Sequence, residues 1–186
     1  AVDSAIMVLD AAAGIEAQTL KLFEVCRLRS VPIITFINKI DREGREPFEL
    51  LDEIAEKLAL DTAPMSWPVG MGGLFEGVYD FEENELYLPE GDSKEFQGKT
   101  VKVDGPEDEK LGEYLSADGV ARVAEEGLLA REGYPAFDFE AYRNGDLTPV
   151  YFGSALKEFG VTAIIDAIAK YAPAPRPQPT DEGEIA

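Results

Sequence analysis

The sequence has 186 residues, of which 45% are hydrophobic and 29% charged, so it is long enough and apolar enough to bury a core. Its 17 Lys and Arg residues against 37 Asp and Glu residues give a formal net charge of −20, which disfavours direct binding to nucleic acids and anionic membranes. The absence of histidine excludes imidazole bases and histidine metal ligands, and the single cysteine excludes an internal disulfide. No apolar run approaches the roughly 20 residues of a membrane-spanning helix, so we expect a cytoplasmic protein.

Residues 1–64 alternate between strand and helix patterns. The apolar run 4–10 predicts a buried strand, and residues 16–29 predict a helix with Leu20, Phe23 and Leu28 on its apolar face. Residues 31–37 predict a second buried strand, and residues 46–60 predict a second amphipathic helix. This β-α-β-α order is typical of an α/β fold with a parallel sheet.

Residues 65–147 follow a different pattern. Segments 77–81 and 85–88 flank Glu83 and Asn84 and predict a hairpin, residues 99–103 predict a further short strand, and residues 118–131 and 138–143 predict helices. We interpret this part as an α+β subdomain inserted into the parallel sheet.

The first pattern resumes in residues 148–172. Residues 148–153 predict another strand of the parent sheet, followed by a closing helix whose buried stripe is Val161, Ile164, Ile165 and Ile168. In residues 173–186, prolines at 173, 175, 177 and 179 predict an extended linker to a further domain. Because the chain also opens directly on a buried strand, we expect it to be a fragment.

The tetrapeptide Asn38-Lys39-Ile40-Asp41 follows the second predicted strand, at the sheet edge where open α/β sheets bind ligands. A carboxylate such as that of Asp41 can accept both the N1 and N2 hydrogens of guanine, whereas adenine would present a lone pair to it. Buried hydrogen bonds of this kind reject the wrong base by roughly 10⁴-fold or more. Asn38 would meet the O6 and N7 edge or tie neighbouring loops together, and Lys39 would lie along the base and sugar. The alternative is a turn in which Asp41 caps the next helix.

Ser154-Ala155-Leu156 follows the next strand of the same predicted sheet. Its small residues allow close approach of the backbone, whose N–H groups could donate to guanine O6, with Ser154 bracing the turn. Taken alone, Ser-Ala is more simply a helix cap. Its pairing with the first motif favours a shared guanine site.

At these residues the sequence resembles the G domain of translational GTPases, and within them the release-factor branch. The segments that carry the resemblance include 36–42, 66–70, 75–79 and 151–156. The resemblance implies a P-loop-NTPase-like sheet, with residues 1–64 and 148–172 forming part of the G domain. It implies GTP or GDP as ligand and a ribosome-associated GTPase that promotes release-factor recycling in translation termination. The inserted subdomain would face the ribosomal stalk, and class I release factors would be partners of the full-length protein.

The phosphate-binding sequence G-x-x-x-x-G-K-[ST] is not present. Gly98-Lys99-Thr100 comes nearest, but the position of the first glycine is Ser93, so we interpret it as a polar loop entering a strand. We therefore expect no catalytic or metal-binding residue here, no GTP hydrolysis by this segment, and Mg²⁺ only in the full-length protein. The alternatives are a fragment similar to elongation factor G and a non-enzymatic acidic α/β module that docks a protein.

Overall fold

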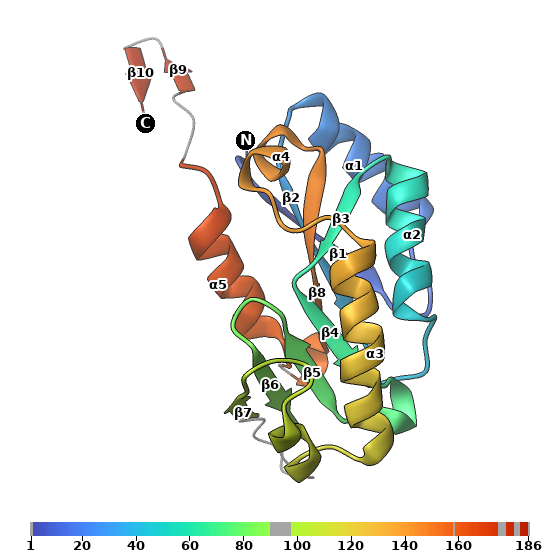
Figure 1. The fold of residues 1–186 in the computed structure, drawn as a ribbon. Coiled ribbons are helices and arrows are strands. Elements are labelled where there is room, and N and C mark those ends of the chain that lie inside the picture. Colours follow the sequence, from blue (N-terminus) through green and yellow to red (C-terminus); the bar gives the residue numbers. More distant parts are fainter. Residues whose placement is uncertain (1, 90–97, 158, 175–177, 181–182, 186) are drawn as a thin grey trace.

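The computed structural model describes residues 2–89, 98–157, 159–174, 178–180 and 183–185. A four-stranded parallel sheet lies at its centre, with the strand order β1-β2-β8-β3 (Figure 1). The bounds of its strands and of the helices around it are β1 Ala5–Asp10, α1 Ala17–Leu28, β2 Ile33–Asn38, α2 Pro47–Leu58, β3 Asp61–Pro64, β8 Leu147–Phe152 and α5 Val161–Tyr171.

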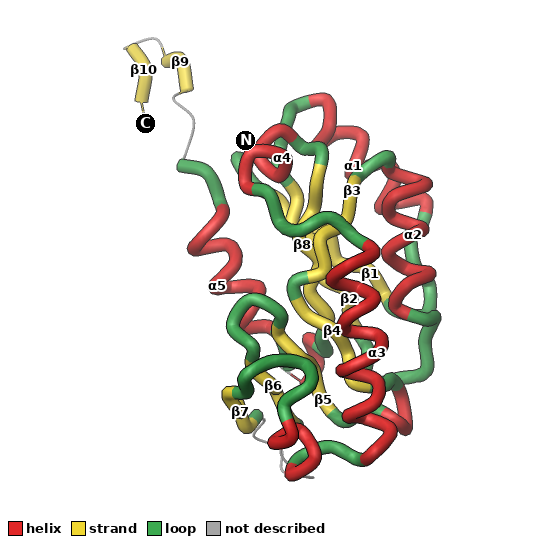
Figure 2. The backbone as a smooth tube through the Cα atoms, in the orientation of Figure 1, coloured by secondary structure: helices red, strands yellow, loops and turns green. Residues whose placement is uncertain are grey.

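The second sheet is antiparallel, with the strand order β4-β5-β6-β7. Its strands and the remaining helical segments are β4 Ser66–Val69, η1 Gly72–Leu74, β5 Gly77–Asp80, β6 Glu85–Leu88, β7 Lys99–Lys102, η2 Glu109–Glu113, α3 Ala117–Gly133, α4 Phe139–Asn144 and η3 Ala155–Lys157. The predicted hairpin is formed by β5 and β6, and the further strand predicted after it is β7. Both predicted helices are present as α3 and α4. The predicted fold class, a parallel α/β sheet combined with an α+β part, is therefore confirmed (Figure 2).

Helices cover the two faces of the parallel sheet. Phe23 of α1 and Ile54 of α2 pack with Met7, Leu9 and Ile33 on one face. On the other face, Ile164 and other residues of α5 pack against the alternate residues of β2 and β8. Strand β2 is therefore buried on both faces, which explains why its sequence is mostly apolar. Its buried polar side chain, that of Thr35, is hydrogen-bonded to the Thr148 hydroxyl.

Strand β1 lies at the edge of this sheet and is covered on one face. Met7 and Leu9 are buried, whereas Ile6 and Val8 are 42% and 54% exposed. The alternation follows from the two-residue repeat of a strand, in which successive side chains point to opposite faces. The buried half of β1 anchors α1, and the other half presents apolar side chains to solvent.

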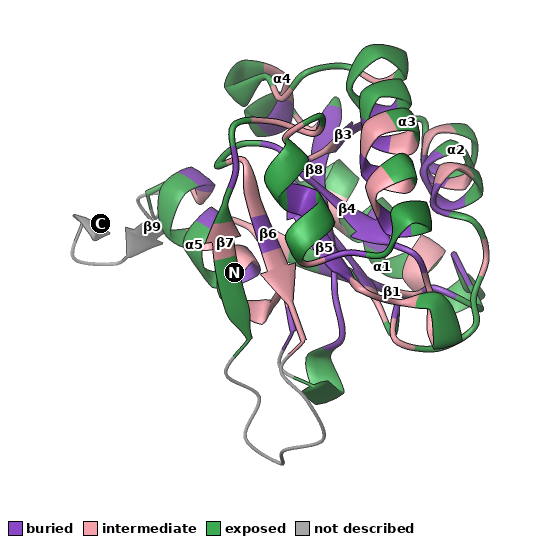
Figure 3. Ribbon diagram, turned by 60° about the horizontal axis from the view of Figure 1, so that its bottom comes forward, coloured by how far each residue is buried: buried purple, intermediate pink, exposed green. Residues whose placement is uncertain are grey.

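The two sheets share one core. Trp67 and Tyr79 of the antiparallel sheet belong to the same buried cluster as Ile37, Val150 and Phe152 of the parallel sheet. The backbone N–H of Phe152 donates to the Ser66 hydroxyl at 3.1 Å, which joins β8 to β4. Figure 3 shows this burial along β4, β5 and β8. The antiparallel sheet thus supports the strand that leads into residues 153–160.

Several elements differ from the sequence expectations. Strands β3 and β4 were not expected, because each has four residues and contains a proline, which is rare in the interior of a sheet. Two side chains assigned to buried helix faces are exposed: Leu28 at the end of α1 is 86% exposed and Ile165 on α5 is 58% exposed. Helical periodicity places Leu28 and Ile165 near the apolar faces of their helices. It does not determine whether the sheet extends far enough to cover these side chains.

The expected proline linker lies partly outside the described residues, which omit 175–177, 181–182 and 186. The described residues of this segment include two short strands, β9 (Gln178–Thr180) and β10 (Gly183–Ile185), which pair antiparallel. The sequence pattern does not predict this pair. Within the described part of the chain, no helix combines the length and apolarity that membrane crossing requires.

The hydrogen bond between Ser66 and Phe152 should contribute to the stability of the fold. Replacement Ser66→Ala leaves a buried N–H without its acceptor, so the free energy of unfolding should fall by about 1–3 kcal/mol. Urea unfolding followed by tryptophan fluorescence measures this change. Thr162→Ala, which removes an exposed hydroxyl on α5, serves as the control and should change stability by less than about 0.5 kcal/mol. An equal effect of the two substitutions would contradict the role of Ser66.

Candidate functional site

The carboxyl ends of β1, β2 and β8 bring the candidate residues to one edge of the parallel sheet. Asp10 pairs in register with Asn38, and Ile37 pairs with Phe152, so the chain leaves three neighbouring strands at nearly the same level. Lys39 turns the chain after β2 with a φ of 69°, in the left-handed region. The segments that follow β2 and β8 therefore lie beside each other.

Asn38 fastens these two segments together. Its side-chain Oδ1 accepts hydrogen bonds from the backbone N–H of Lys39 and from that of Ala155, each at 2.8 Å. The backbone N–H of Ile40 donates to the carbonyl of Gly153 at 3.3 Å, which adds a second connection. Of the two roles considered for Asn38, the structure shows the one that ties the loops, with Oδ1 engaged inside the protein.

Asp41 lies beside the second loop. Its side chain is 8% exposed, and its Oδ2 atom lies 3.4 Å from Nζ of Lys157. Burial acts to raise the pKa of Asp41, but the Ser154 hydroxyl and the Lys157 ammonium more than offset it, so this pKa lies below its ordinary value. Asp41 is thus held as a carboxylate at neutral pH.

Ser154 is buried, with 1% of its surface exposed. Its hydroxyl lies close enough to Asp41 to lower the pKa of that group, yet among the described residues it makes no hydrogen bond of ordinary geometry. Its backbone N–H and carbonyl both bond with Phe159, which closes the loop after β8. A buried hydroxyl without a partner is uncommon in folded proteins and leaves hydrogen-bonding capacity at this position.

Lys39 forms an ion pair with Asp10, with 2.6 Å between Nζ and Oδ2. The same carboxylate accepts the backbone N–H groups of Ala12 and Ala13 at 2.8 and 3.4 Å. The hydrogen bond from Lys39 is the main cause that lowers the pKa of Asp10. Asp10 therefore anchors the long side chain of Lys39 across the ends of β1 and β2.

The remaining predicted site residues divide into buried and exposed ones. The side chain of Ile40 is fully buried in the core, so it can offer a ligand only its backbone atoms. Leu156 is 79% exposed, and Ala155 is exposed next to it. The edge thus combines Asn38, Lys39, Asp41, Ser154, Ala155 and Leu156, with the side chain of Ile40 directed away from it.

Sequence reasoning missed Asp10 and Lys157. Asp10 ends the first strand at the same sheet edge as Asn38, which was a usable signal. Lys157 carried no such signal, because its ion pair with Asp41 joins residues far apart in the chain. The alternative in which Asp41 caps the next helix is wrong, because α2 begins at Pro47 after Glu46. Lys99 and Thr100 belong to β7, so the strand predicted at Gly98-Lys99-Thr100 is present, whereas the loop before Gly98 lies outside the described residues.

The segment between β4 and β5 supports both loops of the site. The N–H of Gly72 donates to the carbonyl of Ile40 at 3.1 Å. The rings of Phe75 and Phe159 pack edge to face with centroids 5.4 Å apart. The antiparallel sheet is therefore connected directly to the two segments that carry the candidate residues.

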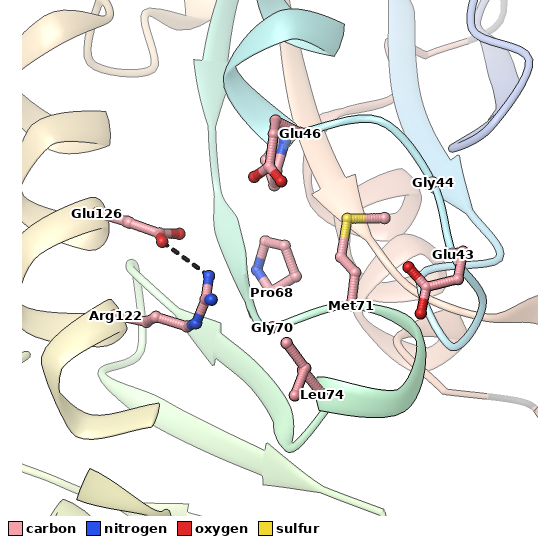
Figure 4. A pocket seen from close by; sticks show the side chains of 10 residues that line it. Glu43, Gly44, Glu46, Pro68, Gly70, Met71, Leu74, Arg122 and Glu126 are labelled. Carbon is pink, nitrogen blue, oxygen red and sulfur yellow. Dashed lines mark hydrogen bonds and ion pairs between the residues drawn. The ribbon is translucent and has the colours of Figure 1, made fainter. Parts of the chain in front are cut away.

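A small pocket is lined by residues of the loop after β2, of segment 68–74 and of α3 (Figure 4). Its volume is about 100 Å³, and its lining includes Glu43, Met71 and Arg122, with Arg122 ion-paired to Glu126 at 3.0 Å. Pockets for drug-sized ligands usually measure about 300–1,000 Å³, so this one is too small for a nucleotide. Neither Asp41 nor Ser154 lines it. No group of three or more metal-ligating side chains occurs among the residues that the structure describes.

Comparison with known proteins places the chain in a family. Residues 1–174 match the family described as the elongation factor Tu GTP binding domain. A protein of Symbiobacterium thermophilum named peptide chain release factor 3 is 45% identical over 178 residues, which cover 96% of this chain and 34% of that protein. A protein of Bordetella pertussis with the same name is 47% identical over 185 residues, which cover 100% of this chain and 34% of that protein.

The chain therefore spans about a third of the length of these curated relatives. A protein of Thermus thermophilus with a known crystal structure superposes with a TM-score of 0.64 at 24% sequence identity, over 92% of this chain and 27% of that chain, which shows a shared fold. The resemblance to translational GTPases and to their release-factor branch is confirmed. This chain belongs to the elongation factor Tu GTP binding domain family.

Proposed function

We propose that this chain binds the guanine base of GTP or GDP as part of a ribosome-associated GTPase that promotes release-factor recycling in translation termination. One observation carries the proposal: an ionised, largely buried Asp41 carboxylate lies on a loop that Asn38 fastens to the Ser154 loop. The family match and the two relatives named peptide chain release factor 3 support this function over one similar to elongation factor G.

The chemistry of base reading follows from the donor and acceptor pattern. The two oxygens of Asp41 accept the N1 and N2 hydrogens of guanine, whereas adenine would leave this carboxylate facing a lone pair. Lys39, held at its tip by Asp10, lays its methylene groups along the base and sugar. The exposed side chain of Leu156 covers the base from the other side.

The donor to guanine O6 comes from the loop after β8. The backbone N–H groups of Ser154 and Ala155 already donate to Phe159 and to Asn38. We therefore assign the contact to the N–H of Leu156, and we assign the bracing of the turn to Ser154 through its backbone, whose N–H and carbonyl bond with Phe159. This refines the expectation that the loop as a whole reads O6.

The domain organisation and partners are parts of the same proposal. Residues 1–64 and 148–172 form the base-reading part of a G domain, residues 65–147 are an inserted subdomain that faces the ribosomal stalk, and residues 173–186 are a linker. Because the sequence contains no phosphate-binding loop, we assign the phosphate and Mg²⁺ contacts, and hydrolysis itself, to regions outside this chain. Class I release factors and a cytoplasmic location belong to the full-length protein.

Replacement of Asp41 tests base recognition. In the gene product that contains this chain, Asp41→Asn should weaken GDP binding by roughly 10²-fold, because the negative charge is lost and one acceptor oxygen becomes an amide donor that faces a guanine N–H. The variant should prefer xanthosine diphosphate, whose carbonyl stands where guanine has its amino group. Fluorescence titration or calorimetry gives both affinities. Asp61→Asn, at the opposite end of the sheet, is the control, and unchanged GDP affinity in Asp41→Asn would refute the assignment.

Replacement of Asn38 tests the connection between the loops. Asn38→Ala should expose the amide of Ala155 to exchange, so that its hydrogen-exchange protection falls at least several-fold before any nucleotide is added. GDP affinity should fall with it, because the second loop is no longer positioned. Asn144→Ala, an exposed substitution at the end of α4, should leave both quantities unchanged. Retained protection at Ala155 would show that the loops do not depend on this bond.

A further inference from the structure

Lys157 is a charged group at the site that the base-reading chemistry does not use. It ends η3 after the Ser154 loop, and its Nζ lies 3.4 Å from Oδ2 of Asp41. Its side chain is 49% exposed, whereas that of Asp41 is 8% exposed. A half-exposed ammonium thus contacts a largely buried carboxylate of the proposed site.

Other charged groups on the neighbouring segments make contacts of their own, and the side chain of Arg42, which follows Asp41, is exposed. Lys39, two residues earlier, is paired with Asp10. On the segment that packs against the loop from the antiparallel sheet, Glu76 accepts hydrogen bonds from the N–H and hydroxyl of Ser116. The carboxylate of Glu43 lies at the small pocket, toward Gly72. Among the described residues, Lys157 is the cation in ion-pair contact with Asp41.

A bound base changes the solvation of the Asp41 carboxylate. When a purine covers the site, the carboxylate loses its remaining water, which penalises its negative charge unless a cation stays nearby. A carboxylate has about four lone-pair positions, so Oδ2 can retain the ammonium while both oxygens face the base. Lys157 lies 3.4 Å from Oδ2, so the ammonium takes at most one of these positions on that oxygen and leaves the others for the base.

We propose that Lys157 is a positioning residue for base recognition, which keeps the Asp41 carboxylate charged and directed toward guanine. This inference rests on the proposed function of the site. Lys157 would then contribute to base specificity without touching the base, because it acts through Asp41. Lys157→Met should weaken GDP binding roughly two- to tenfold, and Lys157→Arg should retain it.

The pH dependence provides a readout that does not require nucleotide. The pKa of Asp41 is lowered in the folded protein, so the ionised form is retained at neutral pH and lost as the pH falls through that value. Removing the Lys157 ammonium removes one of the causes that lower it. In Lys157→Met, the carboxyl carbon of Asp41, followed by NMR, should therefore protonate at a higher pH than in the unaltered chain.

A double-mutant cycle separates positioning from a merely structural role. In the gene product that contains this chain, GDP affinity is measured for Lys157→Met, Asp41→Asn and the double variant. If Lys157 acts through the carboxylate, Lys157→Met should have little effect once Asp41 is Asn. Lys57→Met is the matched control, because Lys57 is also 49% exposed and paired with a carboxylate that is 10% exposed, that of Glu53.

Each outcome decides the inference. Unchanged or tighter GDP binding in Lys157→Met would overturn the inference. It would also be overturned if Lys157→Met weakened GDP binding equally in the unaltered protein and in the Asp41→Asn variant. In both cases the proposed function would stand. If the unaltered protein does not bind GDP, both the proposed function and the inference fail. Weaker binding that disappears in the Asp41→Asn background, together with a higher protonation pH for Asp41, would support it.

Discussion

The candidate site depends on the parallel pairing of β2 with β8. The hydrogen bond from the Ala155 N–H to Oδ1 of Asn38 joins residues 117 positions apart in the sequence. It forms because the two strands are hydrogen-bonded neighbours and end at the same level. Without this pairing, Asp41 and Lys157 would belong to unrelated loops. The geometry of the edge is therefore a consequence of sheet topology rather than of either loop alone.

The antiparallel sheet supports the loops after β2 and β8, although it is separate from both loops in the sequence. Its residues continue the core of the parallel sheet through Trp67 and Phe152, whose ring centroids lie 5.6 Å apart. Its first connecting segment contacts the backbone of Ile40 and the ring of Phe159. A close-packed core of this kind transmits displacements because it contains few voids. Contacts on the antiparallel sheet can thus influence how the two loops are held.

The charges at the site are arranged in pairs although the chain as a whole is strongly acidic. Lys39 covers Asp10 and Lys157 covers Asp41, so each carboxylate at the sheet edge has a lysine beside it. Local pairing of this kind lowers the pKa of both carboxylates. It also limits the repulsion that an uncompensated acidic edge would exert on an anionic ligand. The net charge of −20 therefore says little about the field at the site itself.

The sequence by itself determined the helices, most of the strands, the parallel order and the motif at the end of β2, because apolar periodicity and turn residues are local properties. Strands β3 and β4 were not predicted, because a four-residue segment that contains a proline shows little apolar periodicity. The exposure of Leu28 and Ile165 and the pairing of Lys157 with Asp41 were decided by the tertiary structure. Burial and ion pairing depend on which distant segments become neighbours, and that information is spread over the whole chain.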